Sequence, residues 1–432
     1  MPLRRKRGFV NLRHFDLNEG KAVTMLRLSR VAALSLVIVL SGCSTLLRDP
    51  APSARMADAR IGEFTSIRYT PLADSKPVAD AIRQAFVGET PDNYETLPDG
   101  GRRYDYLAVS GGGSDGAFGA GLLNGWSAHG DRPKFKFVTG VSTGSLIAPL
   151  AFLGSDYDAK LKEAYTTIDA AHVFVLRDMI MLPWAEALAD TAPLRQIVAK
   201  YVSEDVLDAI AAEHAKGRRL YVATTNLDEE QPVIWDMGAI ASSKNPGRLA
   251  LFREILVASS SIPAFFPPVL MKVTIDGKIY DEMHVDGGVF FQAFGVGAVV
   301  DLPAAIRDAN PDFSGQIEQR LYVIRNGRID AVPSPVARGL GSISARAIAT
   351  LIKVSGINDL YRLYLGSLQD DVEFRYVTIP RGDQPLTTEE FNKEEMNRKF
   401  EMGRKMGIEG IPWQSTPPGY STPEAPTTVT SG

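Results

Sequence analysis

Two serines in this sequence stand in a Gly-x-Ser-x-Gly pattern, which can place a serine hydroxyl on a tight turn between a strand and a helix. They are Ser114, within Gly112–Gly116, and Ser142, within Gly140–Gly144. The flanking glycines lack the Cβ atoms that would clash in so sharp a bend. The helix that follows points its N-terminal amides toward the serine. Such a turn suits nucleophilic attack on a carbonyl carbon, with the amide after the serine stabilising the oxyanion.

The residue after each serine separates the two candidates. After Ser142 it is Thr143, which is neutral, whereas after Ser114 it is Asp115, whose carboxylate opposes negative charge that develops nearby. We therefore favour Ser142 as the nucleophile. The stretch Gly111–Gly116 is better explained as a loop of bare backbone amides that leads into a helix and could hold an oxyanion or a phosphate.

The same loop has the Gly-x-Gly-x-x-Gly spacing of dinucleotide-binding folds. Those folds also require an acidic residue that closes a second strand about 20 residues later. Asp131 lies instead in a turn beside Pro133. Dinucleotide binding is therefore disfavoured.

A serine nucleophile needs a proton acceptor, which is usually a histidine held by a carboxylate. His284 is the strongest histidine candidate, because it stands two residues before Asp286 on a predicted strand and would share its face. Asp286 itself closes the predicted strand 279–285, and Gly287 and Gly288 follow it, so it can approach another backbone turn closely. An ordinary Asp-Gly turn is the alternative. The remaining histidines are weaker candidates: His14, His129, His172 and His214.

Strands, glycine-rich turns and helices alternate around these residues, which predicts a parallel α/β sheet. The predicted strands are 104–110, 135–141, 219–227, 319–325 and 371–379. The predicted helices are 117–129, 145–153, 193–216 and an amphipathic one at 343–368. Asp276 and Gly277 fit a hairpin turn between two further strands.

Composition excludes several classes of protein. The chain has 432 residues, of which 45% are hydrophobic and 23% charged, the balance of a globular core. Residues 1–30 hold eight basic and two acidic residues, a local charge of +6; since the whole chain carries −4, the rest carries −10. An acidic body offers no electrostatic footprint for nucleic acid. Cys43 is the single cysteine, which excludes an intrachain disulfide and a multi-cysteine metal site.

The N-terminal residues predict export. Arg27 and Arg30 precede the short apolar run 31–40, which is followed by small residues, as in a secretory signal. The sequence Leu40-Ser41-Gly42-Cys43 resembles the bacterial lipoprotein signal, which implies that Cys43 becomes the lipidated first residue. Ser44 after it implies the outer membrane, with the protein facing the periplasm of the cell envelope. A plain signal peptide or an N-terminal anchor is the alternative.

The predicted organisation has five segments. They are a signal peptide at 1–43, of which 1–24 could be an over-called start, a tether and cap region at 44–103, a catalytic domain at 104–368, its C-terminal extension at 369–410, and a disordered tail rich in Pro, Thr and Ser at 411–432.

Three motifs in this order resemble the patatin-like phospholipases: Gly111–Gly116, Gly140–Gly144 and Asp286-Gly287-Gly288. Residues 223–237 and 258–269 are also similar to segments of that family, and the resemblance covers roughly 104–368. It implies a three-layer α/β/α fold with a mostly parallel central sheet. It also implies a Ser–Asp dyad in place of a Ser–His–Asp triad.

The resemblance further implies a role for each motif residue. Ser142 would attack an acyl ester of a membrane lipid, and Asp286 would accept the proton. The backbone amides of Gly111, Gly112, Gly113 and Thr143 would hold the oxyanion, and the other motif glycines are Gly116, Gly140, Gly144, Gly287 and Gly288. No metal or cofactor is implied. Asp115 departs from the family, which usually has Arg or Lys there.

Several alternatives stay open at this point. The same dyad could serve an acyltransferase or a thioesterase, and the chain could be a catalytically silent lipoprotein that binds lipid in the envelope. An α/β-hydrolase with His284 in a triad is a third possibility. The apolar stretch 262–270 could line an acyl pocket or simply pack in the core. The sequence does not indicate the oligomeric state.

Overall fold

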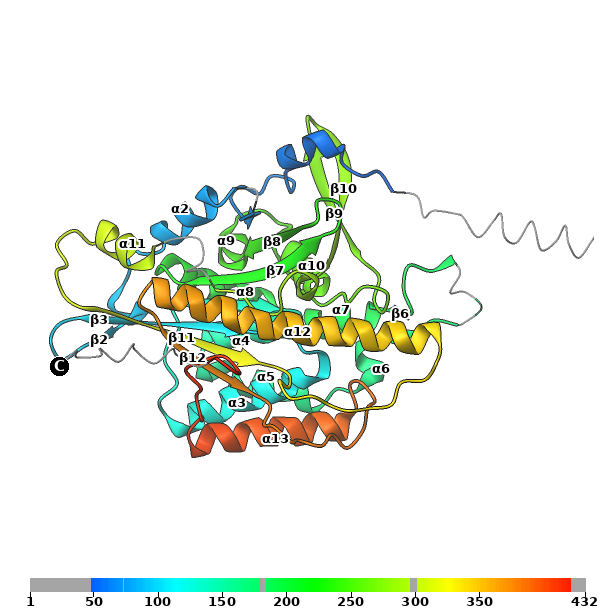
Figure 1. Ribbon diagram of the computed structural model, residues 1–432. Helices are drawn as coiled ribbons and strands as arrows, with labels where there is room; N and C mark the ends of the chain where they lie inside the picture. Colours follow the sequence, from blue (N-terminus) through cyan, green and yellow to red (C-terminus); the bar gives the residue numbers. More distant parts are fainter. Residues whose placement is uncertain (1–47, 73, 179, 181–183, 296–300, 421–432) are drawn as a thin grey trace, which may run out of the picture. The chain divides into compact units, whose positions relative to one another are not determined.

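The computed structural model describes residues 48–420, except 73, 179, 181–183 and 296–300. The predicted signal peptide and Cys43 lie outside the described residues. The larger of two compact units, Asp49–Asp178 with Glu186–Gly432, contains every element described below. Its centre is a ten-stranded sheet (Figure 1). Five neighbouring strands of this sheet run parallel, in the order β7 (Arg219–Asn226), β4 (Phe137–Val141), β3 (Arg102–Val109), β11 (Ile317–Arg325) and β12 (Glu373–Thr378).

Antiparallel strands extend this parallel core. They are β8 (Gln231–Asp236) and β1 (Arg68–Tyr69) beyond β7, β2 (Glu95–Thr96) beside β3, and a hairpin of β9 (Val269–Ile275) and β10 (Lys278–Asp286). Asp276 and Gly277 form the hairpin turn as the sequence predicts, both with positive φ. A second, two-stranded sheet pairs β5 (Val175–Leu176) with β6 (Ala189–Asp190). The mostly parallel α/β class is thus confirmed.

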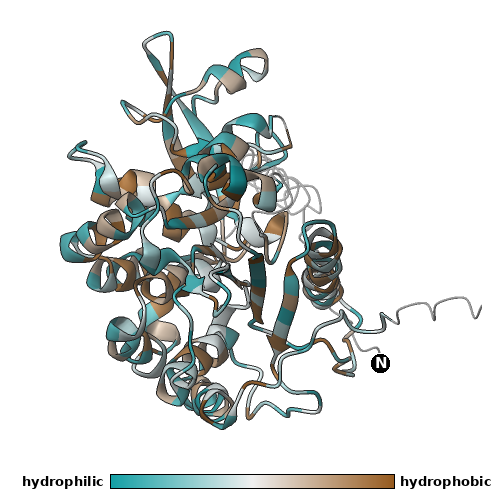
Figure 2. Ribbon diagram, turned by 90° about the vertical axis from the view of Figure 1, so that its left-hand side faces the viewer, coloured by the Kyte–Doolittle hydropathy of each residue, from teal (hydrophilic) through white to brown (hydrophobic). Residues whose placement is uncertain are grey.

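Helices cover both faces of the sheet because successive strand residues point to opposite sides. In β3, Leu107 and Val109 belong to one hydrophobic core, whereas Tyr106 and Ala108 belong to the other. The first core packs against α3 (Gly116–His129), α4 (Thr143–Leu153), α5 (Asp158–Thr166), α7 (Ala192–Tyr201), α8 (Glu204–Ala215), α9 (Met237–Ser242), α10 (Arg248–Ser259) and α13 (Lys393–Glu409). The second packs against α2 (Lys76–Gln84), α11 (Leu302–Ala309) and α12 (Leu340–Gln369). Figure 2 shows these layers in profile, with α12 at the right, which confirms the three-layer α/β/α fold.

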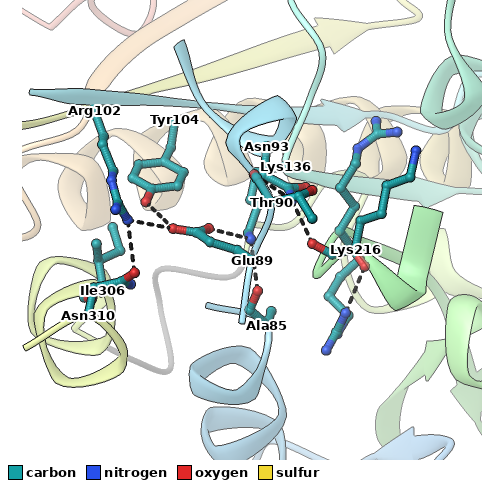
Figure 3. A network of polar contacts seen from close by, with 12 residues as sticks. Ala85, Glu89, Thr90, Asn93, Arg102, Tyr104, Lys136, Lys216, Ile306 and Asn310 are labelled. Atoms are coloured by element: carbon teal, nitrogen blue, oxygen red, sulfur yellow. Dashed lines mark hydrogen bonds and ion pairs between the residues drawn. The ribbon is translucent and has the colours of Figure 1, made fainter. Parts of the chain in front are cut away.

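The region expected to be a tether and cap is part of this unit from Asp49 onward. Figure 3 shows how one buried carboxylate fixes it to the sheet. Glu89 accepts hydrogen bonds from the hydroxyl of Tyr104 (2.6 Å), from Arg102 (3.0 Å) and from Nζ of Lys136 (2.7 Å). Burial lowers the pKa of Lys136 to about 8, against the opposing effect of Glu89.

The prediction of a disordered tail at 411–432 is wrong for its first ten residues. Gln414 exchanges two backbone hydrogen bonds with Tyr376 in β12, and the ring of Trp413 packs against Trp126 and Tyr322 at centroid distances of 5.1 and 5.0 Å. These few large aromatic contacts outweigh the polar average composition of the segment. Residues 421–432 lie outside the described residues.

The helix expected at 343–368 is present as α12, but it is not amphipathic along its length. Its buried residues all lie in the second half, and they include Asp359, Leu360 and Leu363. Within the described residues, α12 is the one helix long and apolar enough to cross a membrane by length and composition. The expected buried stripe is absent from its first half, where leucine and isoleucine side chains are exposed.

Candidate active site

Ser142 lies on the sharp turn that its sequence motif predicts, between the end of β4 and the start of α4. Its φ of +54° and ψ of −128° are strained for a residue with a Cβ. Four hydrogen bonds hold this conformation. The Ser259 hydroxyl accepts from the Ser142 amide (3.0 Å) and donates to the Ala223 carbonyl (2.7 Å), while Ser145 donates its amide and hydroxyl to the Ser142 carbonyl (2.8 and 2.6 Å).

The motif glycines permit close packing around this turn. A Cβ on Gly140 would lie 2.5 Å from the Gly144 carbonyl oxygen, and one on Gly144 would overlap the Val109 carbonyl oxygen in β3. A Cβ on Gly116 would overlap the Thr143 side chain. These contacts explain the glycine spacing on steric grounds alone.

The register of the sheet explains how Asp286 comes close to Ser142. β4 pairs with β7 as far as Val141, which lies opposite Ala223. Along the same edge of β7, the next residue, Thr224, pairs with Asp286, the last residue of β10. β10 therefore pairs with the part of this β7 edge that lies beyond the end of β4, and Asp286 comes next to the turn at Ser142.

Asp286 is buried, with 4% of its surface exposed. Its Oδ1 accepts a hydrogen bond from the Gly288 amide (2.7 Å), whereas its Oδ2 is buried without a partner within hydrogen-bond geometry among the described residues. The Ser142 hydroxyl nevertheless lies close enough to influence the carboxyl. Burial raises the pKa of Asp286 to about 7, and the Ser142 hydroxyl and the Gly288 amide counteract part of that rise. A Cβ on Gly287 would lie 2.5 Å from the Ala223 carbonyl oxygen, which shows how closely this loop approaches β7.

The predicted oxyanion loop follows β3 and adjoins the Ser142 turn. The amide of Gly111 is engaged, because it donates to the Gln292 carbonyl (3.0 Å). No hydrogen bond among the described residues occupies the amide of Gly112. A Cβ on Gly112 would overlap the Asn326 carbonyl, so only glycine fits beside that strand end. Thr143 is the first residue of α4, and its hydroxyl pairs with that of Tyr165 (2.7 Å).

The unusual acid in this loop has a partner that the sequence did not reveal. The Nζ of Lys399, in α13, forms an ion pair with Asp115. Burial raises the pKa of Asp115, and Lys399 opposes that rise. A cation thus stands beside the loop although residue 115 is acidic. Ser114, the rival nucleophile, donates its hydroxyl to Glu390 (2.8 Å).

Comparison of the chain with known protein families finds a match. Residues 107–298 match the model of the patatin-like phospholipase family. The chain contains a patatin-like phospholipase domain. None of the curated proteins compared with the chain matches it.

Three solved structures are similar to the chain only at a low level. VipD from Legionella pneumophila is 11% identical, with a TM-score of 0.32, and the match covers 73% of this chain and 69% of that one. Human GIVD cytosolic phospholipase A2 is 11% identical, with a TM-score of 0.28 and coverage of 72% and 50%. The type III effector protein ExoU is 12% identical, with a TM-score of 0.18 and coverage of 74% and 56%. The chain thus matches about half the length of the last two.

An apolar pocket opens beside Ser142 in the patatin-like domain. It encloses about 800 Å³ of space, open solvent at its mouth included, and most of its lining side chains are apolar, as is usual for ligand pockets. Of the apolar stretch 262–270, Ile262 and Phe266 line it. Helices α4, α5, α7 and α10 and the residues around α6 (Ala170–Val173) provide most of the remaining wall, together with Phe391 and Met396.

His284 does not serve Ser142 in the patatin-like domain. Its side chain is fully buried, with Nδ1 paired to the Thr224 hydroxyl (2.9 Å) and Nε2 to Glu282 (3.2 Å). Both ring nitrogens are therefore engaged by other groups. His284 acts as a structural residue behind Trp235, whose indole N–H donates to the same Thr224 hydroxyl (2.8 Å).

Sequence reasoning missed two serines of this site. Ser259 holds the strained turn, and Ser260 lines the pocket with a buried hydroxyl that has no partner among the described residues. Ser259 is the last residue of α10 and Ser260 follows it, in a run of three serines, 259–261, which was the only local signal. Gln292 was also missed; besides accepting from Gly111, its side-chain amide donates to the Gly288 carbonyl (2.9 Å) and so joins the two loops.

Proposed function

We propose that this protein is a serine hydrolase that cleaves acyl esters of membrane lipids, with Ser142 as the nucleophile and Asp286 as its proton acceptor. The observation that carries the proposal is the adjacency of three features. A strained serine turn, a buried carboxyl with one unpartnered oxygen and an apolar pocket adjoin one another. The family match of residues 107–298 supports lipid esters as the class of substrate.

In the first half of the reaction, the Ser142 hydroxyl passes its proton to Oδ2 of Asp286 as its oxygen attacks the ester carbonyl. The raised pKa of Asp286 suits this task, because a base works best when its pKa lies near the working pH. The negative charge of the tetrahedral intermediate falls on the former carbonyl oxygen. The amides of Gly112, Gly113 and Thr143 are the proposed donors, since that of Gly111 is engaged by Gln292.

The intermediate then breaks its bond to the alcohol, which takes the proton back from Asp286 and leaves an acyl group on Ser142. In the second half, Asp286 accepts a proton from water, whose oxygen attacks the acyl carbon. Ser142 recovers its hydrogen and the fatty acid departs. The apolar pocket would hold the acyl chain through both halves of the reaction. The unpartnered Ser260 hydroxyl in the pocket wall would offer a polar contact to the ester group.

Fluorophosphonate labelling with a lipid panel tests this proposal. The full chain and its Ser114→Ala variant, a control in the rival Gly-x-Ser-x-Gly pattern, should be labelled and should release fatty acid. Ser142→Ala should do neither, and Asp286→Asn should lose about 10²–10⁴-fold in rate. Fatty-acid release by Ser142→Ala would contradict the assignment. Acyl transfer to an added alcohol in preference to water would instead indicate an acyltransferase, and a folded chain without labelling or turnover would indicate a silent lipid-binding protein.

We also propose that lipidated Cys43 anchors the protein in the bacterial outer membrane, facing the periplasm. The support is the sequence before and after the single cysteine. A Cys43→Ala variant should appear in the soluble fraction of cells, and its continued sedimentation with membranes would contradict the anchor.

A further inference from the structure

The first half of α12 and the segment before it expose an unusual amount of apolar surface. Leu340 is 86% exposed and Leu351 is 70% exposed. In total, residues 331–355 expose eight large aliphatic side chains, those of Val332, Val336, Leu340, Ile343, Ile348, Leu351, Ile352 and Val354. Large contiguous apolar surfaces of this kind mark interaction sites.

The charges of this surface are all of one sign. Residues 331–355 contain Arg338, Arg346 and Lys353 and no Asp or Glu, although the whole chain is acidic. Arg346 donates to the Val332 carbonyl (2.6 Å), and Lys353 donates to the Asp330 carbonyl. No carboxylate of the described residues lies within ion-pair distance of these three cations.

The length of the exposed part of α12 and the anchoring of its second half favour lying along a membrane surface over crossing it. Its second half is fixed to the protein, because Asp359 accepts hydrogen bonds from the amides of Gln292 (2.6 Å) and Ala293 (3.1 Å) in the loop after β10, and Leu360 and Leu363 pack in the second hydrophobic core. The exposed part of the helix, 340–355, is about 24 Å long at 1.5 Å per residue, shorter than the hydrocarbon core of a bilayer, about 30 Å. A helix that exposes both apolar side chains and basic residues suits the interface between headgroups and acyl chains.

We propose that residues 331–355 are the surface by which this protein docks on an anionic lipid bilayer. The aliphatic side chains would enter the upper acyl region, and the cations would meet the lipid phosphates, as basic segments beside a membrane do. A second copy of the chain fits less well, because two such surfaces would bring like charges together.

The position of the surface suits delivery of substrate. In Figure 1, the first half of α12 extends beyond β11 and β12 at their carboxyl ends, and because the sheet core is parallel this is the end at which Ser142 follows β4. Gln292, which Asp359 holds, also contacts the loop at Gly111 and the loop at Gly288. The docking proposal goes beyond the proposed function, since it requires neither Ser142 nor Asp286 to react.

The test measures the environment of one labelled position in the full chain with Ser142→Ala, so that vesicles are not hydrolysed. Because Cys43 is the single cysteine, Cys43→Ala with Ile348→Cys gives one site for an environment-sensitive fluorophore. Ile279→Cys is the matched control, on β10, where the side chain is 62% exposed. Both proteins carry the same N-terminal residues, so those residues contribute equally.

We expect the label at 348 to shift to the blue on vesicles of neutral lipid with 30% phosphatidylglycerol, and the label at 279 not to shift. Arg338→Gln and Arg346→Gln should each weaken vesicle binding about fivefold, and Leu351→Ser about tenfold, with Ile279→Ser unchanged and all variants folded by circular dichroism. An absent shift at 348, or an equal shift on neutral vesicles, would overturn the proposal. So would a shift at 348 that grows with protein concentration in the absence of vesicles, because the occupant would then be a second copy.

Discussion

The pH dependence of catalysis tests the role of Asp286 most directly. Burial raises the pKa of its carboxyl from 3.8 to about 7, and a general base must be ionised to accept a proton. With that pKa, about 9% of the enzyme is active at pH 6 and about 1% at pH 5, so kcat/KM should rise about tenfold per pH unit and level off above pH 8. A soluble p-nitrophenyl ester, which needs no membrane surface, provides the assay.

Asp236 is the matched control for this profile. It is also buried, its pKa is raised to about 6, and its carboxylate caps α9 through the Ala239 amide (2.8 Å). Asp236→Asn should leave the midpoint of the profile unchanged, whereas Asp286→Asn should remove the activity. A wild-type kcat/KM that stays flat down to pH 5 would refute the reasoning.

The same pKa has a consequence for stability. The folded carboxyl keeps its proton up to about pH 7, whereas the unfolded one loses it near pH 4, so the free energy of unfolding should fall as pH rises from about 4 to 7 and level off above. The shift of about three pH units corresponds to about 4 kcal/mol. Asp286→Asn should therefore unfold at higher urea concentration than the wild type at pH 8, with a gain of at most this size. Equal urea midpoints of the two proteins at pH 8 would mean that burial does not destabilise the ionised Asp286 carboxylate.

Two further substitutions test the surroundings of the site. Ser259→Ala leaves the buried Ser142 amide and Ala223 carbonyl without their shared partner, so it should lower the free energy of unfolding by about 1–3 kcal/mol and lower kcat more than it changes KM. The control is Ser261→Ala, which should retain kcat because the Ser261 hydroxyl donates only to the Val257 carbonyl in the last turn of α10. Equal losses in both variants would argue against a positioning role for Ser259. Lys399→Met leaves the Asp115 carboxylate without its cation, so the free energy of unfolding from chemical denaturation should fall by about 3 kcal/mol. Adding Asp115→Asn should recover most of that loss. No recovery in the double variant would mean that Lys399 acts through other contacts.

The sequence alone determined the parts of this protein that depend on local sterics. The Gly-x-Ser-x-Gly spacing predicted the turn at Ser142, and a Cβ on Gly140 would collide within the turn itself, with the Gly144 carbonyl. The need for glycine at 144 is different, because a Cβ there would collide with Val109 in β3. The alternation of strands and helices predicted the α/β class, since periodicity is a local property. The Asp276–Gly277 turn was predicted on equal grounds.

Only the tertiary structure decided which groups meet. The sequence left His284 and Asp286 as neighbours on one strand, and the pairing of β10 with β7 beyond the end of β4 decided that Asp286 comes next to Ser142. The engagement of the Gly111 amide, the Lys399 partner of Asp115 and the pocket wall from α5 and α7 likewise join residues far apart in the chain. Burial, which sets the pKa of Asp286, is a property of the assembled layers, and no window of sequence contains it.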